Sequence, residues 1–288
     1  SEIINTMQIL TKIEDLRKEL SVFRRNGQRI GLVPTMGYLH AGHLSLVNVA
    51  KENADVVVMS IFVNPTQFGP NEDLARYPRD FARDERLARE CGVDFIFYPE
   101  VPEMYPEPFF TYIVNEQMAQ VLCGVSRQIH FRGVTTIVAK LFNIVQPDVA
   151  VFGQKDAQQA IIIRQMVADL NFPIRIIVAP TVRESDGLAL SSRNVYLSPE
   201  ERRQAPVIYS ALTKARAAVR DGMNSATEIK ELIRSTIATA SLALIDYIEI
   251  VDDRTLTSVE IVEPGTFVAV AVYYGQTRLI DNIYLKER

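Results

Sequence analysis

The run of residues 56–63 limits the fold of this chain more than any other segment. Its residues are largely β-branched, and apolar side chains occupy both its odd and its even positions. A strand that is buried on both faces has this composition, and such strands lie in parallel sheets that helices cover on each side. We therefore predict a central strand of a helix-covered parallel sheet at these residues.

Helical and strand-like segments alternate around this run. A first helix is predicted from Ile13, where apolar residues begin to recur at helical spacing, up to a stop at Gly27. Thr11 and Glu14 form a capping-box pattern at its start. The repeated βα order predicts a Rossmann-like, doubly wound parallel α/β sheet over residues 1–185. Further strands are predicted at 30–33, 95–97, 149–152 and 175–178, and further helices at 42–53, 81–91, 134–145 and 156–170.

A different order follows residue 185. Two helical stretches come first, and three strand-like runs come after them. A hairpin turn is predicted at Gly275-Gln276, between the last two runs. Helices followed by antiparallel strands predict a smaller α+β domain over residues 186–288, placed as a lid on the first. The helices are predicted at 199–220 and 226–242, and the strands at 247–251, 267–274 and 278–284.

The composition is that of an ordinary globular protein, and it excludes several classes of function. The 288 residues carry a net charge of −4, so no overall field attracts a polyanion such as nucleic acid. Cys91 and Cys123 lack the spacing of a disulfide framework or a zinc site. Residues 1–5 lack the basic start of an export signal, and no apolar run approaches the length of a membrane span. We expect a cytoplasmic protein without nucleic-acid or membrane partners.

The sharpest local signal is His40-Ala41-Gly42-His43, which follows a predicted strand and turn and opens a predicted helix. Ligands of open α/β sheets bind beyond the carboxyl ends of strands, where a helix N-terminus offers free N–H groups to phosphate. Histidines three residues apart on a first turn project to the same side, and Gly42 lets a nucleotide approach the backbone. Two imidazoles could therefore contact one polyphosphate. The alternative is a chance pair of surface histidines.

Two further polar segments lie at the same predicted edge of the sheet. Gly153-Gln154-Lys155-Asp156 directly follows a strand, and its lysine suits a phosphate while its aspartate suits ribose hydroxyls. Ser191-Ser192-Arg193 lies in the loop that enters the second domain, where two hydroxyls and a guanidinium could close over a triphosphate. Each segment has a plainer alternative, a solvated helix cap in the first case and a polar linker in the second.

Two primary amides are candidates for binding a hydroxy acid. Gln67 follows the central strand, and Gln159 lies one helical turn beyond Lys155 and Asp156. Two amides can orient a hydroxy acid without adding charge. The loop at residues 124–133 contains two arginines and is either a basic surface turn or a flap over the substrate.

Together these segments resemble the signature of the pantothenate synthetase family, within the wider HxGH nucleotidylyltransferase group. The match runs in order and spacing from residue 30 to residue 197, and the run from Arg278 to Asn282 resembles the family's C-terminal end. The HxGH element alone is shared with the wider group and with class I aminoacyl-tRNA synthetases. The motifs that carry the resemblance are Pro34-Thr35-Met36-Gly37 with His40 and His43, Phe62-Val63-Asn64-Pro65, Gln67-Phe68, Tyr77-Pro78-Arg79, Phe152-Gly153-Gln154-Lys155-Asp156 with Gln159, and Asp186-Gly187 with Ser191-Ser192-Arg193-Asn194.

The resemblance implies an ATP-dependent ligase that joins pantoate to β-alanine through a pantoyl-adenylate and releases AMP and pyrophosphate. It also implies Mg²⁺ on the nucleotide, a homodimer, and Gln67 and Gln159 as the ligands of pantoate. The candidate catalytic residues are His40, His43, Lys155 and Arg193, with His43 as the family's usual proton donor. The implied ATP-binding residues are Met36, Gly37, Tyr38, Leu39, His40, Ala41, Gly42, His43, Gly153, Gln154, Lys155, Asp156, Val182, Leu190, Ser191, Ser192 and Arg193.

One position departs from the family pattern, because Gln128 follows Arg127 where the family usually has proline. Proline would restrict the loop, so the rigidity of the flap and the role of Arg127 stay open. Two rival functions also stay open. A nucleotidylyltransferase acting on a phosphorylated acceptor would need a second basic phosphate site, against which the two glutamines argue. A non-catalytic nucleotide sensor would lack some of the phosphate-contacting groups, and none is missing here.

Overall fold

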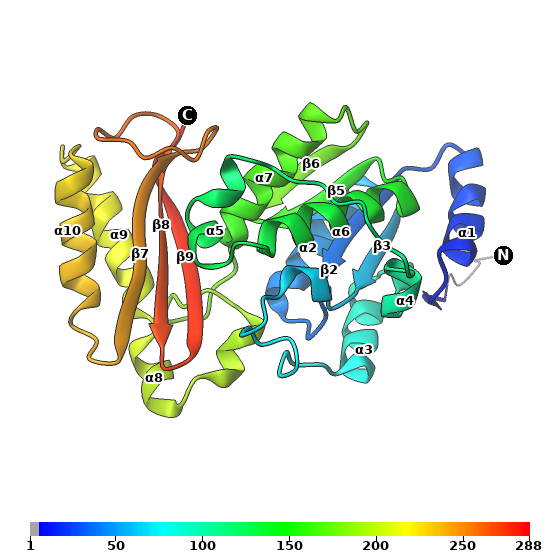
Figure 1. Ribbon diagram of the computed structural model, residues 1–288, viewed down its shortest axis with the longest axis horizontal. Coiled ribbons are helices and arrows are strands. Elements are labelled where there is room, and N and C mark those ends of the chain that lie inside the picture. Colours follow the sequence, from blue (N-terminus) through cyan, green and yellow to red (C-terminus); the bar gives the residue numbers. More distant parts are fainter. Residues whose placement is uncertain (1–5) are drawn as a thin grey trace.

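The apolar run at the centre of the sequence forms strand β3 (Val56–Ile61), and all six of its residues are buried. In the computed structural model, which describes residues 6–288, β3 lies inside a six-stranded parallel sheet (Figure 1). Val56 and Val58 belong to the core on one face of the sheet, and Val57 and Met59 belong to the core on the other. Burial on both faces therefore accounts for the unbroken apolar sequence.

Helices cover each face of this sheet, which confirms the predicted doubly wound α/β fold. Helices α1 (Ile13–Arg25), α6 (His130–Val145) and α7 (Ala157–Asp169) pack on one face. Helices α2 (Ala41–Asn53) and α3 (Phe81–Cys91) pack on the other. The remaining strands are β1 (Gln8–Leu10), β2 (Ile30–Thr35), β4 (Phe95–Phe97), β5 (Val149–Gly153) and β6 (Arg175–Ala179), and the short helices are α4 (Val101–Met104) and α5 (Cys123–Ser126).

The strand order β1-β4-β3-β2-β5-β6 places a switch point between β2 and β5. From β2 the chain passes through α2 to β3, which pairs with one edge of β2. Strand β5 pairs with the other edge of β2, with Gly31 opposite Val149. The loops after β2 and β5 consequently diverge from neighbouring carboxyl ends. In open α/β sheets this is the place where a ligand crevice forms.

A three-stranded antiparallel sheet forms the second unit, made of β7 (Ala243–Asp252), β8 (Thr266–Tyr274) and β9 (Thr277–Lys286). Helices α9 (Val207–Arg220) and α10 (Ala226–Ile237) cover its outer face (Figure 1). Alternate residues of β8 point the other way, and Phe267 and Ala269 join the core of the larger sheet. The hairpin expected at Gly275-Gln276 is confirmed. The domain boundary near residue 185 stays a prediction.

Local differences from the sequence expectations have identifiable causes. The expected helix at 199–220 is two helices, α8 (Pro199–Gln204) and α9, because Pro206 interrupts it. The helix expected at 226–242 ends at Ile237. The capping box expected at Thr11 is not formed, since Glu103 accepts the N–H of Ile13 at 2.9 Å instead. Strand β1 was not predicted.

Residues 1–5, on which the expected absence of an export signal partly rests, lie outside the described residues. Within residues 6–288, no helix has the combination of length and apolar character that crossing a bilayer requires.

Candidate active site

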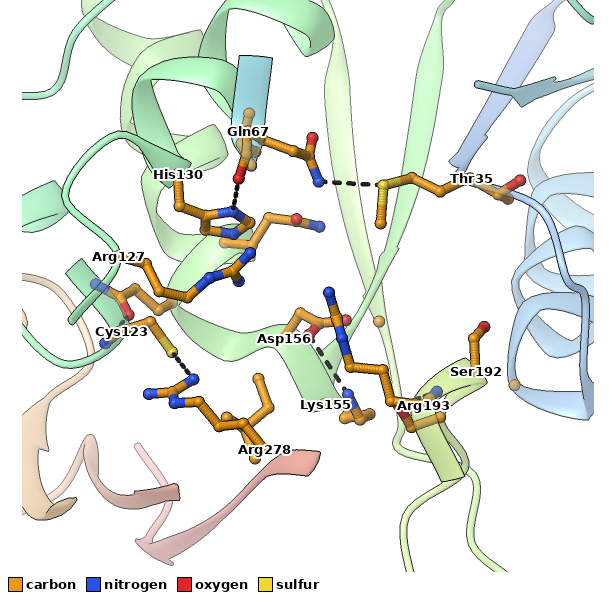
Figure 2. A pocket seen from close by; sticks show the side chains of 18 of the residues that line it. Thr35, Gln67, Cys123, Arg127, His130, Lys155, Asp156, Ser192, Arg193 and Arg278 are labelled. Carbon is orange, nitrogen blue, oxygen red and sulfur yellow. Dashed lines mark hydrogen bonds and ion pairs between the residues drawn. The ribbon is translucent and has the colours of Figure 1, made fainter. Parts of the chain in front are cut away.

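A cavity of about 870 Å³ opens beyond the carboxyl ends of β2, β3 and β5 (Figure 2). Met36, Asn64 and Gly153 follow or end these three strands and line it, and residues of the β8–β9 hairpin close its far side. Its size lies at the upper end of the range for small-molecule sites. The cavity therefore has room for a nucleotide together with a small acid.

The two histidines of the HxGH element hold each other in place at the start of α2. His40 Nδ1 accepts the N–H of Gly42 at 3.0 Å, and His43 Nδ1 accepts the N–H of His40 at 3.2 Å. Their ring centroids lie 4.0 Å apart, and both rings line the cavity. Because each Nδ1 is an acceptor, each neutral ring carries its hydrogen on Nε2. The pair thus offers two Nε2–H donors.

Both imidazoles are neutral near pH 7. Burial, followed by the positive charge of Lys155, lowers the pKa of His40 to about 4. Burial also holds the pKa of His43 well below its ordinary value, with further contributions from His40 and Lys155. A neutral imidazole can donate a hydrogen bond to a phosphate oxygen without the cost of burying a charge. In this state His43 is suited to donating a hydrogen bond.

The turn before these histidines is fixed by a carboxylate from α3. Asp84 is buried and accepts the N–H groups of Tyr38 at 2.8 Å and of Leu39 at 2.7 Å. Gly37 has a φ of +80°, and a Cβ there would lie 2.9 Å from Asp84 Oδ2. The turn therefore requires glycine at Gly37, for its conformation and for the close approach of Asp84.

The three predicted phosphate-binding segments meet around the cavity. Lys155 Nζ lies 3.6 Å from Asp156 Oδ1 at the start of α7. Ser192 Oγ donates to the carbonyl of Tyr38 at 3.2 Å, which ties the loop into the second unit to the turn after β2. Lys155, Ser192 and Arg193 all lie on one side of the cavity (Figure 2). All three segments therefore line the same cavity.

Most of the predicted ATP-binding residues line the cavity, and five do not. Those that line it are Met36, His40, Gly42, His43, Gly153, Lys155, Asp156, Val182, Leu190, Ser191, Ser192 and Arg193. Gly37, Tyr38, Leu39, Ala41 and Gln154 do not line it. Leu39 is fully buried in the core. Direct contact of any of these residues with ATP stays a prediction.

Gln67 and Gln159 also line the cavity, next to an apolar wall. Gln67 is buried; its Nε2 donates to the sulfur of Met36 at 3.2 Å, and its Oε1 accepts from Asn64 at 3.0 Å. Pro34, Phe62, Val138 and Leu141 form the apolar wall. This part of the cavity suits a compact acid with both methyl and hydroxyl groups.

A family model described as pantoate-beta-alanine ligase matches residues 8–284. The chain belongs to this family. Pantothenate synthetase from Acetivibrio thermocellus is 54% identical over 280 residues, which cover 97% of this chain and 100% of that protein. The Moorella thermoacetica enzyme is also 54% identical, with 97% and 99% coverage. The predicted family is therefore confirmed.

Solved structures give the same result. Pantothenate synthetase from Thermus thermophilus superposes with a TM-score of 0.93 at 45% identity, over 97% of this chain and all of that one. A Francisella tularensis pantoate-beta-alanine ligase, complexed with beta-gamma ATP and beta-alanine, superposes with a TM-score of 0.81 at 36% identity. That match covers 97% of this chain and 98% of the Francisella chain.

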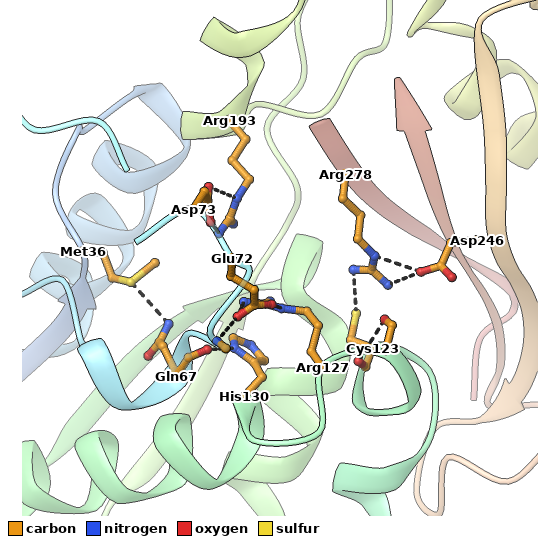
Figure 3. A network of polar contacts seen from close by, with 12 residues as sticks. Met36, Gln67, Glu72, Asp73, Cys123, Arg127, His130, Arg193, Asp246 and Arg278 are labelled. Carbon is orange, nitrogen blue, oxygen red and sulfur yellow. Dashed lines mark hydrogen bonds and ion pairs between the residues drawn. The ribbon is translucent and has the colours of Figure 1, made fainter. Parts of the chain in front are cut away.

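Sequence reasoning missed two acidic residues of this family member. Glu72 pairs with Arg127, and Asp73 accepts from Arg193 at 2.9 and 3.0 Å (Figure 3). Burial acts to raise the pKa of each carboxyl, but the hydrogen bonds and charges of the two arginines, together with a backbone N–H in each case, outweigh it and hold both pKa values below their usual range. Their signal is weak, because two acidic residues in a loop are ordinary surface chemistry.

His130 is a third histidine of the cavity that was not singled out. Its Nδ1 lies 3.1 Å from the carbonyl of Gln67, which can only accept, so Nδ1 carries the hydrogen. Burial, then the charge of Arg127, lowers its pKa to about 3. Nε2 therefore carries the lone pair of the neutral ring. The position of His130 in the predicted flap was the available signal.

Proposed function

We propose that this chain catalyses the ATP-dependent condensation of pantoate with β-alanine to pantothenate, with AMP and pyrophosphate as the other products. Membership of the pantoate-beta-alanine ligase family supports the activity. One observation of the structure supports it most strongly. A single cavity joins the imidazole pair and Lys155 to a glutamine-lined apolar wall. ATP and β-alanine are bound by the Francisella relative, and we extend both ligands to this chain.

In the first step the pantoate carboxylate attacks the α-phosphorus of ATP. An acyl–oxygen–phosphorus bond forms, the bond from the α-phosphorus to the bridging oxygen breaks, and pyrophosphate leaves. Negative charge builds on the phosphate oxygens. His40 and His43 supply neutral Nε2–H donors, while Lys155 and Arg193 supply positive charge. Such preorganised donors stabilise a transition state because they need no reorganisation when the charge develops.

Pantoate binds at the wall that contains Gln67 and Gln159. The two amides hold its carboxyl and hydroxyl groups, and the apolar side chains of Phe62 and Val138 pack against its methyl groups. Asn64 fixes the orientation of the Gln67 amide, since it donates to Oε1 and leaves Nε2 directed at Met36 and the cavity. This orientation presents a donor to the acid.

In the second step the β-alanine amine attacks the acyl carbon, and AMP leaves. Arg127 and Arg193 are the candidate ligands for the carboxylate of β-alanine, since guanidinium groups suit carboxylates. Both are paired with carboxylates of the chain, Glu72 and Asp73. Carboxylate partners already at these positions support a carboxylate ligand for the two arginines. No covalent bond to the protein is needed in either step.

Mg²⁺, a dimer and a cytoplasmic location complete the proposal. In the part of the chain from residue 6 onward, no group of three or more His, Cys, Asp or Glu side chains could hold a metal ion. The protein side chains therefore do not form a cage for Mg²⁺, and the ion would be held by the phosphates of ATP. The homodimer is part of the proposal because the family resemblance implies it.

Conversion of ATP to AMP in the presence of pantoate, β-alanine or both tests this proposal. AMP should accumulate steadily only when both acids are present. Transfer of AMP to a phosphorylated acceptor would support the nucleotidylyltransferase alternative. ATP binding without turnover under any of these conditions would support the sensor.

A further inference from the structure

Two consecutive residues of β9 contact the two loops that line the proposed phosphate site. Asn282 is only 5% exposed, and its Nδ2 donates to the carbonyls of Gln154 at 2.8 Å and of Lys155 at 3.1 Å. Its Oδ1 accepts from Gln154 Nε2 at 3.0 Å. Both hydrogens of the Asn282 amide are thus used on the backbone that carries Lys155.

Asp281 holds the second loop in a similar way. Its carboxylate is 4% exposed and accepts two hydrogen bonds from Arg183, at 2.6 and 2.9 Å. Arg183 also donates to the carbonyl of Gly187 at 3.1 Å and lies over the ring of Tyr209. Arg183 pairs with Ala189 just before the segment that carries Ser192 and Arg193. Asp281 therefore fixes the base of that loop.

The strand geometry explains how neighbouring residues reach different loops. Successive side chains of a β-strand point to opposite faces. The pairing of β9 with β8 fixes the position of both residues along the strand, because Asp281 lies opposite Val270 and Asn282 lies opposite Ala269. One dipeptide of the second unit consequently determines where the two phosphate-site loops lie relative to each other.

We propose that Asn282 is a positioning residue for the adenylate-forming step, and that it acts through the backbone of Gln154 and Lys155. This inference rests on the proposed function, in which Lys155 contacts the phosphates of ATP. The carbonyls of Gln154 and Lys155 can pair only with a donor at Nδ2. A carboxylate in its place would put an acceptor against two acceptors and displace the loop. A displacement of about 1 Å in a catalytic group commonly costs about a hundredfold in rate.

The first test compares Asn282→Asp with the unchanged protein. Pantoate-dependent exchange of labelled pyrophosphate into ATP should fall by about tenfold or more. The KM for β-alanine should change by less than about twofold, since Asn282 contacts the backbone of Gln154 and Lys155 and neither of the arginines proposed to bind β-alanine. Thr236→Val is the matched control, because it removes a buried hydrogen bond of the second unit, to Leu232, far from the loops. Melting temperatures of both variants report any general loss of stability.

A smaller change keeps the inference testable if Asn282→Asp does not fold. Gln154→Ala removes the hydrogen bond to Asn282 Oδ1 and leaves the two carbonyl contacts in place. It should lower the exchange rate in the same direction, by a smaller factor. An exchange rate equal to that of the unchanged protein in folded Asn282→Asp or Gln154→Ala would overturn the inference.

The decisive test combines Asn282→Asp with Lys155→Ala. If Asn282 acts through Lys155, Asn282→Asp should have little further effect once the Lys155 side chain is absent. Pyrophosphate exchange should then fall by less than about twofold when Asn282→Asp is added to Lys155→Ala. The same loss in both backgrounds would mean a separate structural role and would overturn the inference. Failure of the unchanged protein to exchange pyrophosphate with pantoate present would overturn the proposed function, and this inference with it.

Discussion

The backbone N–H of His40 is bonded to Nδ1 of His43, three residues later on the first turn of α2. This bond fixes the tautomer of His43, so that the imidazole, which lines the cavity, carries its hydrogen on Nε2 as a donor. A positive imidazolium is not required, and burial disfavours it. The HxGH element is therefore best described as a pair of neutral donors at a helix start.

We expect His43→Ala and Lys155→Ala to slow adenylate formation more than amide formation. The charge that these residues stabilise departs with pyrophosphate before β-alanine reacts. Removal of one such donor commonly costs about a hundredfold in rate. Single-turnover formation of pantoyl-adenylate is compared with the reaction of supplied pantoyl-adenylate and β-alanine. Equal slowing of both steps would instead assign these residues to the fold or to the AMP moiety.

Pyrophosphate exchange separates the two steps without any variant. ATP and pantoate, with no β-alanine, should support exchange of labelled pyrophosphate into ATP, because the adenylate forms before the amine attacks. Omission of pantoate should abolish the exchange. Exchange that appears only when β-alanine is present would indicate a concerted route.

Gln67→Ala and Gln159→Ala should mainly affect the binding and turnover of pantoate. Each change should raise the KM for pantoate or lower turnover far more than it alters the affinity for ATP. Gln67→Ala should have the larger effect, since it also leaves Asn64 Nδ2 with one fewer acceptor in a buried site. Initial rates with each substrate varied in turn measure both effects. Equal changes for ATP and pantoate would count against the assignment.

Arg127→Met should weaken the binding of β-alanine and leave the rate of adenylate formation nearly unchanged. The proposed carboxylate ligand is lost while the length of the side chain is kept, so the KM for β-alanine should rise about tenfold or more. Pyrophosphate exchange with pantoate should remain within about twofold. Arg132→Met, an arginine of the same segment that stacks on Tyr112, is the matched control. A matching rise in KM for the control would contradict the proposed site.

The low pKa of His130 predicts a pH-dependent stability. Its folded pKa is about 3, below the ordinary value of 6.5. Between these values the unfolded chain binds a proton that the folded protein does not, so the free energy of unfolding should fall as pH falls from 6.5. His130→Asn keeps a neutral donor and removes the titration. Urea unfolding at pH 5 and pH 7 should show a smaller difference for this variant than for the unchanged protein. Identical differences would refute the prediction.

Sequence reasoning predicted the elements whose signals are local. Helix α3 and strand β4 occur at the predicted residues, because an apolar pattern and the left-handed Gly92 mark their ends. The imidazole pair was also predictable, since its three-residue spacing and its place before a helix are local features.

Contacts between distant segments were not predictable. Arg127 and Glu72 are 55 residues apart, and Arg193 and Asp73 are 120 apart. No spacing rule links them, because only the fold places the loops after different strands next to each other. The role of Asn282 was hidden for the same reason, although its motif was noticed. The tautomers depend on hydrogen-bond partners that the sequence does not show.

The contact between Asp84 and Gly37 has a consequence for how this site can vary. Asp84 belongs to α3, and its carboxylate supports the turn that leads to His40. Any side chain added at Gly37 would collide with that carboxylate, so neither residue can change alone. In a collection of random variants, the two positions should behave as one inherited unit, while exposed neighbours on α3 such as Arg86 and Glu90 accept substitution freely.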